Sequence, residues 1–345
     1  MEDNKVIRIA VDVMGGDFAP SNEILGVLMT LDAIKNDSTK TPIKITLVGD
    51  KQKIETILSD NNALNREDIS IVDAQEVITM HDDPVAALKI KRDSSMIKGM
   101  ELHKEKIVDG FISAGNTGAM LTTATMILGR INGVTRPTIG AFLPTAKGHP
   151  TFLIDIGATV ECHSRFLYEY AVIGSIFSKA ILGITNPSVG LLNVGSEDSK
   201  GTNEHHDTHK SLAVSNLNFI GNVEGNDILL GKSDVVVTDG FTGNVLLKFA
   251  EGFLSLMKIS VKQYSEKNEY TKKNSEIIVP VIKDILGGFN YEEYGGTPLL
   301  GVKGTVIIGH GSSTPKAIMN MIFSAVSAIE KDVCNKIELA FKDQK

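Results

Sequence analysis

Seven short β-branched runs, each ending close to a glycine, constrain the fold of this 345-residue chain. Their apolar residues do not alternate with polar ones, which is typical of strands buried on both faces of a sheet. Helical patterns separate the runs, and this alternation predicts a mainly parallel α/β sheet with helices on both faces. We expect strands at residues 6–13, 43–48, 108–113, 152–156, 189–194, 235–238 and 305–308. We expect helices at residues 20–34, 84–103, 118–131, 164–182, 243–264 and 315–333.

No linker or low-complexity segment divides the chain, so we expect residues 1–345 to form a single α/β domain. Residues 252–288 differ because they hold two helical runs around a polar, charged turn, which predicts a projecting helical hairpin. Its apolar stripe and lysines are typical of a helix that lies on an anionic membrane surface, forms a dimer contact or packs on the sheet. The candidates for membrane or partner contact are Phe253, Leu254, Met257, Lys258, Val261 and Lys262.

Composition excludes several classes of protein. A net charge of −7, a pI of about 5.7 and the absence of tryptophan argue against nucleic-acid binding. Two cysteines are too few for a disulfide framework and fit a reducing cytoplasm. The first residues lack an apolar run, so we expect no signal peptide. The uncharged stretch 111–129 contains polar residues and glycines, and we interpret it as a buried strand followed by a helix rather than a membrane span.

A glycine-rich turn occurs twice, each time between an expected strand and an expected helix. The first copy covers residues 112–118 and the second covers residues 237–244. Glycine lets the backbone approach a ligand closely, and the free N–H groups of a helix N-terminus can hold an anion. The alternative is two ordinary turns in which glycine only closes the bend.

Four more glycine turns follow expected strands, at residues 12–17, 155–159, 193–197 and 308–313. Because ligands of open parallel sheets bind at the carboxyl ends of strands, we expect all six turns to converge on one edge. None of them has the Rossmann or P-loop spacing, so we expect no nucleotide and no cofactor. His205 and His209 have a spacing that can bind zinc, but no third ligand is obvious nearby, and we expect no metal site.

The sequence resembles the bacterial phosphate acyltransferase family over residues 6 to 330. The most specific segments are Val-Asp-x-Met-Gly-Gly-Asp at residues 11–17 and Tyr-Gly-Gly-x-Pro-Leu-Leu-Gly-Val at residues 294–302. The resemblance implies a three-layer α/β/α fold, similar to phosphate acetyltransferases and to isocitrate/isopropylmalate-dehydrogenase-like enzymes. The other matching segments are residues 113–119, 191–195, 219–225, 239–248 and 310–313. Three positions depart from the family pattern and receive no role: Thr159, Glu161 and Asn290.

The resemblance also implies an activity: reversible transfer of a fatty acyl group from acyl-acyl carrier protein to inorganic phosphate. The acyl phosphate would serve phospholipid (phosphatidic acid) synthesis. The implied partners are acyl carrier protein, inorganic phosphate, a downstream membrane glycerol-3-phosphate acyltransferase, an anionic membrane surface and a second copy in a homodimer. The implied location is cytoplasmic and peripherally membrane-associated. The alternatives are a short-chain phosphate acyltransferase that uses acyl-coenzyme A, and a non-catalytic membrane-docked scaffold for lipid enzymes.

The reaction needs residues that hold phosphate, stabilise an oxyanion and help a thiolate to leave. One oriented donor in a dry site contributes about 3 kcal/mol to such stabilisation. The catalytic candidates are His310, Asn116 and Asn244, although His310 has the alternative of only bonding a neighbouring loop. Lys91 and Arg92 could contact phosphate or the acidic carrier protein. The candidates for phosphate or substrate binding are Gly15, Gly16, Asp17, Ser113, Gly115, Thr117, Gly118, Lys91, Arg92, Asn193, Gly240, Thr242, Gly243, Ser312 and Ser313.

Overall fold

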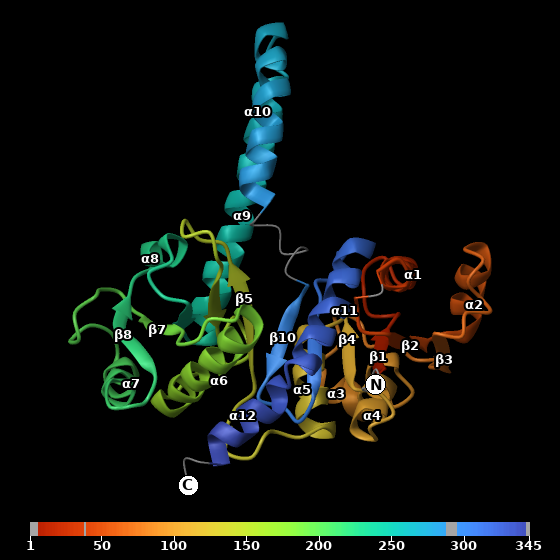
Figure 1. Ribbon diagram of the computed structural model, residues 1–345, viewed down its shortest axis with the longest axis horizontal. Coiled ribbons are helices and arrows are strands. Elements are labelled where there is room, and N and C mark those ends of the chain that lie inside the picture. Colours follow the sequence, from red (N-terminus) through yellow and green to blue (C-terminus); the bar gives the residue numbers. More distant parts are fainter. Residues whose placement is uncertain (1–5, 38, 288–294, 343–345) are drawn as a thin grey trace.

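The computed structural model describes residues 6–37, 39–287 and 295–342, with the side chains of residues 283–287 excepted. In this part of the chain, eleven strands form one sheet with the order β3-β2-β1-β4-β11-β10-β5-β6-β9-β7-β8 (Figure 1). The strands are β1 (Ile7–Asp12), β2 (Ile43–Gly49), β3 (Ile69–Asp73), β4 (Gly110–Ser113), β5 (Thr138–Leu143), β6 (Thr151–Ile154), β7 (Ser188–Leu192), β8 (Asn218–Val223), β9 (Val235–Val237), β10 (Thr297–Leu300) and β11 (Thr305–Ile308). The helices are α1 (Ser21–Lys35), α2 (Lys51–Asp60), α3 (Pro84–Ile90), α4 (Ser95–Lys104), α5 (Thr117–Ile127), α6 (Ser164–Leu182), α7 (Asn203–Ala213), α8 (Gly225–Leu230), α9 (Gly240–Ser265), α10 (Glu269–Gly287), α11 (Pro315–Glu330) and α12 (Val333–Lys342).

The direction of the strands changes in the middle of the sheet. The strands β3, β2, β1, β4 and β11 are parallel to one another, and so are β6, β9, β7 and β8. Between the two groups, β10 is antiparallel to β11 and to β5, and β5 is antiparallel to β6. Three reversals make the two groups run in opposite directions. The expectation that all six glycine turns share one edge is therefore wrong, because the carboxyl ends of the two groups lie at opposite edges of the sheet.

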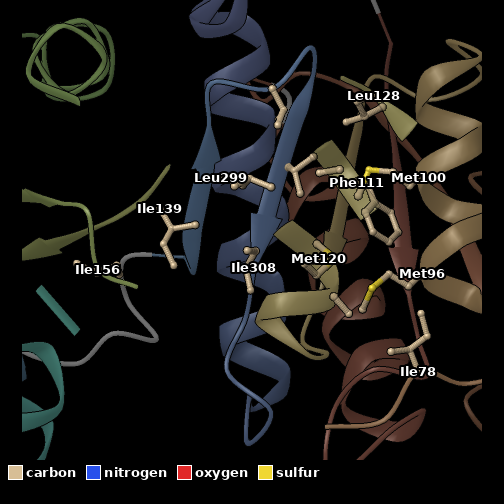
Figure 2. Close-up of a cluster of buried hydrophobic side chains, with 14 of the residues drawn as sticks. Ile78, Met96, Met100, Phe111, Met120, Leu128, Ile139, Ile156, Leu299 and Ile308 are labelled. Carbon is tan, nitrogen blue, oxygen red and sulfur yellow. The ribbon is translucent and has the colours of Figure 1, made fainter. Parts of the chain in front are cut away.

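Helices cover both faces, which confirms the predicted α/β class with a large, mainly parallel sheet (Figure 1). On one face, α1 and α11 pack against β1 and β2 through side chains such as Ile24 and Ile322. On the other face, Phe111 of β4 lies among methionines of the neighbouring helices, including Met96 and Met100 of α4 and Met120 of α5 (Figure 2).

Local sequence signals explain where several helices begin. The Asn116 side chain accepts a hydrogen bond from the Ala119 amide and caps α5, and Asp239 caps α9 in the same way through the Thr242 amide. Prolines follow the N-caps of α3 and α11, where their missing N–H group costs nothing. The sequence predicts the same first-turn position for Pro20, but Pro20 occupies the N-cap of α1 instead.

Every predicted strand and helix is present in the structure, but some boundaries differ and several elements were not predicted. The range 84–103 is not one helix, because Ser94 adopts an extended conformation and caps a new helix, α4. The strands β3, β5, β8 and β10 were not predicted, and β5 and β10 are the ones that reverse the sheet. The uncharged stretch 111–129 is a buried strand followed by α5, as predicted.

The predicted helical hairpin consists of α9 and α10, and it projects away from the sheet (Figure 1). Its predicted last residue, Gly288, lies outside the described residues. Within α9, Leu254, Met257 and Val261 are half-buried, whereas Phe253 is 52% exposed. Within the described ranges, none of the helices combines the length and apolar character needed to cross a membrane.

Candidate functional site

The carboxyl ends of β1, β4 and β11 form a hydrogen-bonded group of loops, which we call the β1–β4–β11 site (residues 12–17, 113–118 and 309–313). The Gly309 amide donates to the Ser113 carbonyl oxygen at 2.8 Å and joins the β11 and β4 loops. The Ser113 hydroxyl donates to Asp12 Oδ2 at 2.7 Å and joins the β4 and β1 loops. It also accepts from the Gly115 amide at 3.0 Å. Three candidate segments that are far apart in the sequence thus meet at one place.

Asp12 is the centre of this arrangement. Its carboxyl group is 1% exposed and also accepts a hydrogen bond from the Met14 amide at 3.0 Å. Burial raises the pKa of Asp12, while hydrogen bonds from Ser95, Ser113 and Met14 oppose the rise. Because a carboxylate repels phosphate, the sequence favours a role in holding loop amides or orienting a base for four aspartates near these turns, Asp12, Asp17, Asp155 and Asp239. Asp12 holds the Met14 amide.

Glycines at this site allow a close approach of the loops. A Cβ atom on Gly15 would lie 2.8 Å from Asp12 Oδ2, from Ser113 Oγ and from the Gly115 nitrogen. A Cβ atom on Gly16 would lie within clashing distance of the Glu23 carboxyl group. The glycine pair therefore packs against the protein's own polar atoms.

Glu23, in the first turn of α1, is a residue that sequence reasoning missed. Its side chain is 1% exposed, and its Oε2 atom has no hydrogen-bond partner among the described residues. Burial raises the pKa of Glu23 to about 7, and the negative charges of Asp12 and Asp17 add to the rise. The signal in the sequence was an acidic residue, three residues after Pro20, that directly precedes the apolar run of α1. At neutral pH this carboxyl group can carry a proton.

The N-terminus of α5 carries the first copy of the twin turn. The Asn116 Oδ1 atom accepts from the Ala119 amide at 3.0 Å. Its Nδ2 atom donates to the carbonyl oxygens of residues 79, 80 and 82 at 3.2–3.3 Å. Asn116 therefore caps the helix and holds residues 79–82 in place. The amides of Thr117 and Gly118 have no acceptor among the described residues, as is usual for the first positions of a helix.

The two basic candidates differ in their surroundings. Lys91 Nζ lies 2.6 Å from Asp82 Oδ2 and 2.8 Å from the Val77 carbonyl oxygen, so it holds the loop before α3. The Lys91 ammonium group lowers the pKa of Asp82 to about 2. Arg92 is exposed and forms no ion pair with any described residue. Of the two, Arg92 has the charge that can pair with a ligand.

The β11 loop carries the three remaining candidates of this group. The Ser312 amide donates to His310 Nδ1 at 3.2 Å, and the Ser312 hydroxyl lies 2.7 Å from the same atom. A neutral His310 ring with Nδ1 as acceptor carries its proton on Nε2. Ser313 is 2% exposed and donates to the His310 carbonyl oxygen at 2.6 Å, which closes the turn. Asp17 joins this loop through its amide, which donates to the Gly311 carbonyl oxygen at 2.8 Å.

The second copy of the twin turn belongs to another group of loops, which we call the β6–β9 site (residues 155–159 and 239–244). Asp155 is fully buried and accepts from the amides of Gly157, Ala158 and Thr159 at 2.8–3.1 Å. Burial raises the pKa of Asp155 to about 6 despite these three donors. Asp155 thus holds loop amides, which is one of the roles that the sequence favours for the aspartates of these turns.

The start of α9 packs directly on the Asp155 loop. The Gly240 amide donates to the Thr159 carbonyl oxygen at 2.9 Å, and a Cβ atom on Gly243 would collide with the Asp155 carbonyl oxygen. Thr242 donates its amide and hydroxyl to the Asp239 carboxylate at 2.8 and 2.7 Å. Gly240 and Gly243 allow this close packing. The Asp239 carboxylate lies at the N-terminus of α9.

Two candidate asparagines lie at this edge. The Asn244 side chain is exposed, beside Gly157. Asn193 follows β7, where its Nδ2 atom donates to the Lys200 carbonyl oxygen at 3.0 Å and its Oδ1 atom accepts from the Val194 amide at 2.8 Å. Asn193 therefore holds its own loop, and Asn244 is the more accessible of the two amide groups.

The histidines of α7 have separate partners. His205 Nδ1 lies 2.8 Å from Thr202 Oγ1, and His206 Nε2 lies 2.9 Å from the Ser199 carbonyl oxygen. His209 packs edge-on against the Phe219 ring. In the described part of the chain, no three histidine, cysteine or acidic side chains are grouped closely enough to hold a metal ion.

Two positions quoted from the sequence, Asn290 and Tyr294, lie outside the described residues. The rest of the Tyr-Gly-Gly segment forms a turn that leads into β10. Gly295 and Gly296 have φ angles of 73° and 79°, in the left-handed region that favours glycine. The segment thus sets the position of the strand that reverses the sheet.

Comparison with known proteins agrees with this fold and these loops. Residues 7–336 match the model of a family described as fatty acid synthesis protein. The chain is 44% identical to the phosphate acyltransferase of Bacillus pumilus over 328 residues, which are 95% of each protein. It is 42% identical to the phosphate acyltransferase of Brevibacillus brevis over 332 residues, which are 96% of each.

Solved structures with low sequence identity share the fold. The EutD phosphotransacetylase from Staphylococcus aureus superimposes with a TM-score of 0.58 at 16% identity, covering 95% of both chains. The 4-hydroxythreonine-4-phosphate dehydrogenase from Klebsiella pneumoniae gives a TM-score of 0.52 at 12% identity, covering 94% of this chain and 98% of the other. The predicted similarity to acetyltransferases and dehydrogenases is confirmed at the level of the fold.

Together, the family match and the relatives define the class of this protein as an acyltransferase. The chain belongs to the phosphate acyltransferase family of fatty acid synthesis proteins, which confirms the resemblance seen in the sequence.

Proposed function

We propose that this chain transfers a fatty acyl group from acyl-acyl carrier protein to inorganic phosphate. A phosphate oxygen forms a bond to the thioester carbonyl carbon, the carbon–sulfur bond breaks, and the leaving thiolate takes up a proton. The products are acyl phosphate and the free carrier. Membership in the phosphate acyltransferase family supports acyl transfer to phosphate. The carrier protein as donor rests on the resemblance of residues 11–17 and 295–302.

The observation that carries the proposal is the exposed N-terminus of α5. The amides of Thr117 and Gly118 lack acceptors among the described residues, and the Thr117 hydroxyl is exposed beside them. Their cap, Asn116, is neutral, so the positive end of the helix dipole is available to an anion. We therefore place the phosphate at the α5 N-terminus.

The second copy of the turn is less suited to phosphate. At the α9 N-terminus, the Gly240 amide already has an acceptor and the cap is the Asp239 carboxylate. A carboxylate at this position repels an incoming anion and offsets the helix dipole. Thr242, Gly243 and Asn244 therefore fit phosphate binding less well than the α5 turn does, and they lie at the opposite edge of the sheet from it.

His310 is the candidate proton donor to the leaving sulfur or to the carbonyl oxygen. Its loop lies next to the β4 loop because the Gly309 amide bonds to Ser113. With Nδ1 accepting from Ser312, the neutral ring carries its proton on Nε2, and that proton can be donated. The conversion of thiolate to thiol would complete the reaction.

The decisive experiment incubates the purified protein with labelled phosphate and either long-chain acyl-acyl carrier protein or short-chain acyl-coenzyme A. We expect labelled acyl phosphate from the carrier thioester, without added nucleotide or metal. Turnover only with acyl-coenzyme A would support the short-chain alternative. Failure to turn over any thioester would leave the scaffold alternative and overturn the proposal.

Matched substitutions distinguish the two turns. Thr117→Val removes the hydroxyl beside the proposed phosphate, and we expect the KM for phosphate to rise about tenfold. Thr125→Val is the control, because among the described residues that hydroxyl bonds only the Leu121 carbonyl oxygen of its own helix. If Thr242→Val raises the KM for phosphate and Thr117→Val leaves it unchanged, the phosphate does not lie at α5.

We further propose that the hairpin forms a homodimer through its stem and contacts a membrane peripherally through its tip. The side chains of Phe249, Phe253 and Leu256 are 52–72% exposed and form one stripe on α9, which favours burial against a second copy. The tip instead carries Lys267, Lys272 and Lys273, whose charges fit anionic lipid headgroups. This location would bring acyl phosphate to the membrane glycerol-3-phosphate acyltransferase.

Two variants test these contacts separately. Phe253→Glu with Leu256→Glu should convert the dimer to a monomer in analytical ultracentrifugation. Both side chains are exposed in the single chain, unlike the half-buried Leu254, Met257 and Val261, so the substitutions place charge in the proposed interface. Lys272→Glu with Lys273→Glu should reduce sedimentation with anionic vesicles, while Lys44→Glu should not. A monomeric wild-type protein would overturn the proposed dimer contact. A wild-type protein that does not sediment with anionic vesicles would overturn the proposed membrane contact.

A further inference from the structure

The segment that Asn116 holds, residues 79–82, brings a methionine to the β1–β4–β11 site. The Met80 carbonyl oxygen accepts from Asn116 Nδ2 at 3.3 Å, beside the N-terminus of α5. The Met80 side chain reaches the β11 loop, because a Cβ atom on Gly311 would lie 2.8 Å from Met80 Cε. Met80 therefore connects the helix end that we propose for phosphate with the loop that carries His310.

Met80 is an apolar side chain among polar loops, and it is 42% exposed. In the proposed reaction, the thioester carbon must lie close to the phosphate and to the proton donor. A side chain that touches both loops then lies beside the reacting group. Methionine is flexible and polarizable, so it adapts to apolar groups of varied shape. Met80 is thus placed to contact the start of an acyl chain.

The outer face of α3 continues this apolar surface. α3 lies beside α5 (Figure 1), and a Cβ atom on Gly118 would lie 2.9 Å from Pro84 Cγ, at the start of α3. The inner side of α3 packs into the buried cluster of Figure 2. On its outer side, Val85 and Ile90 are 55% and 74% exposed. A surface helix normally turns polar residues outward, so an exposed apolar face beside a site is typical of a contact surface.

The same face carries positive charge. Lys89 and Arg92 are exposed and form no ion pair with any described residue. Lys89 lies one helical turn after Val85 and therefore on the same side of α3. Two of the three neighbouring aspartates, Asp82 and Asp93, already form ion pairs with other lysines. The local charge is thus opposite to the net charge of −7 of the whole chain, and it favours an acidic partner.

The simplest alternative is that Met80 only fills space over Gly311 and that the rest is ordinary solvated surface. Single exposed apolar residues are common in proteins. This segment differs because its exposed apolar side chains begin at the proposed reaction site and lie beside basic groups. The exposed apolar stripe of α9 is less suitable for the donor, because α9 begins at the opposite edge of the sheet.

We infer that the acyl donor docks on the α3 surface, which consists of Met80, Val85, Lys89, Ile90 and Arg92. The acyl chain lies against Met80 and Val85, and the acidic carrier protein pairs with Lys89 and Arg92. This inference rests on the proposed function, because it gives a place to the donor of that reaction. It also names Met80 as the residue that contacts the acyl chain next to the thioester.

Isothermal titration calorimetry on the full chain, without phosphate, tests the inference separately from turnover. The two ligands are palmitoyl-acyl carrier protein and the same carrier without an acyl group. Met80→Ser should bind the palmitoyl carrier about tenfold more weakly than the wild type and the unacylated carrier equally well, because only the acyl chain loses an apolar contact. Lys89→Glu with Arg92→Glu should weaken binding of both ligands by about tenfold or more.

Matched variants control for each change. Met80→Leu keeps an apolar side chain and should bind the palmitoyl carrier nearly as the wild type does. Met29→Ser removes a methionine of similar exposure, 43%, from α1 and should leave both affinities unchanged. Lys44→Glu with Lys179→Glu changes the net charge equally at exposed positions outside the α3 surface and should also have no effect.

Three results would overturn the inference. The first is a wild-type protein that does not bind the palmitoyl carrier. The second is wild-type affinity for the palmitoyl carrier in Met80→Ser, and the third is wild-type affinity in the Lys89→Glu, Arg92→Glu variant. The thioester assay keeps the proposed reaction separate: binding through the α3 surface without turnover would overturn the reaction alone, whereas turnover with unchanged binding in both variants would overturn the inference alone.

Discussion

The Ser113 hydroxyl donates a hydrogen bond of 2.7 Å to the buried carboxyl group of Asp12, and this bond joins the loops that follow β4 and β1. These residues are 101 positions apart in the sequence. The bond matters because a carboxylate in a dry environment needs donors to remain charged. The Gly115 amide, the Met14 amide and the Gly309 amide all bond to this pair as well.

Ser113→Ala should therefore destabilise the protein. It leaves one Asp12 oxygen without its side-chain donor, and we expect the free energy of unfolding to fall by about 1–3 kcal/mol. Urea denaturation followed by circular dichroism measures the change. Ser70→Ala is the control, because Ser70 bonds to Thr46 at an exposed position and should cost at most about 0.5 kcal/mol. Equal losses in the two variants would contradict the central role of the Ser113–Asp12 bond.

Glu23 should make stability depend on pH near neutrality. Its folded pKa of about 7 lies above its ordinary value, so the folded state holds a proton that the unfolded state has lost. The stabilisation from that proton is present at low pH and is lost as the pH rises through about 7. Glu23→Gln, which stays neutral, should be more stable than the wild type at about pH 8, on the order of 2–3 kcal/mol, and the difference should shrink towards about pH 5.

The measurement for Glu23 is urea denaturation of wild type and variant across this pH range. Glu101→Gln serves as the control, because Glu101 is an exposed carboxyl group on α4 and should show no such pH dependence. A stability difference for Glu23→Gln that does not vary with pH would mean that the carboxyl group is not protonated in the folded protein.

Gly15→Ala should disrupt the β1–β4–β11 site. The added methyl group would lie 2.8 Å from three polar atoms, one of them the Gly115 backbone nitrogen, so the loops must separate. We expect about 1–3 kcal/mol of lost stability and at least about tenfold lower turnover. Gly225→Ala, where no atom lies within 4 Å of the added group, should be neutral in thermal unfolding and in the acyl phosphate assay. Full activity in Gly15→Ala would show that the close approach of the loops is unnecessary.

The charge of the α5 cap should govern the affinity for phosphate. Asn116→Asp keeps the acceptor for the Ala119 amide but places a negative charge beside the proposed phosphate, and we expect the KM for phosphate to rise by about tenfold or more. Asp239→Asn makes the reciprocal change at α9 and should leave the KM for phosphate unchanged. The two values come from initial rates at varied phosphate concentration. The opposite ranking would move the phosphate to α9.

Asn116→Ala tests the other role of this residue. The variant loses the helix cap and the three contacts to residues 79–82, and we expect a loss of about 1–2 kcal/mol in urea denaturation. Asn61→Ala is a suitable control, because within the described part of the chain its side chain bonds only the Ile57 carbonyl oxygen, at an exposed helix end. A variant as stable as the wild type would mean that residues 79–82 do not depend on Asn116.

The apolar runs and glycine turns were enough to predict the class of fold and the positions of most buried strands. For example, residues 305–308 form the predicted strand, and Ser164–Leu182 forms the predicted helix. Such predictions succeed because a strand buried on both faces needs consecutive apolar side chains wherever it lies in the sheet. The same logic failed for β5 and β10, whose short segments carry no signal for the direction in which they pair.

The sequence by itself determined that this chain builds an α/β sheet whose strands end in glycine turns, and which loops carry polar groups. Only the tertiary structure decided which of these loops meet. The reversal through β10 and β5 separates the Asp12–Ser113 loops from the Asp155–Asp239 loops. The packing of α1 places the buried Glu23 carboxyl group beside Gly16 in the first group. The physical reason is that hydrogen bonding between strands fixes their order and direction, and these depend on contacts between residues far apart in the chain.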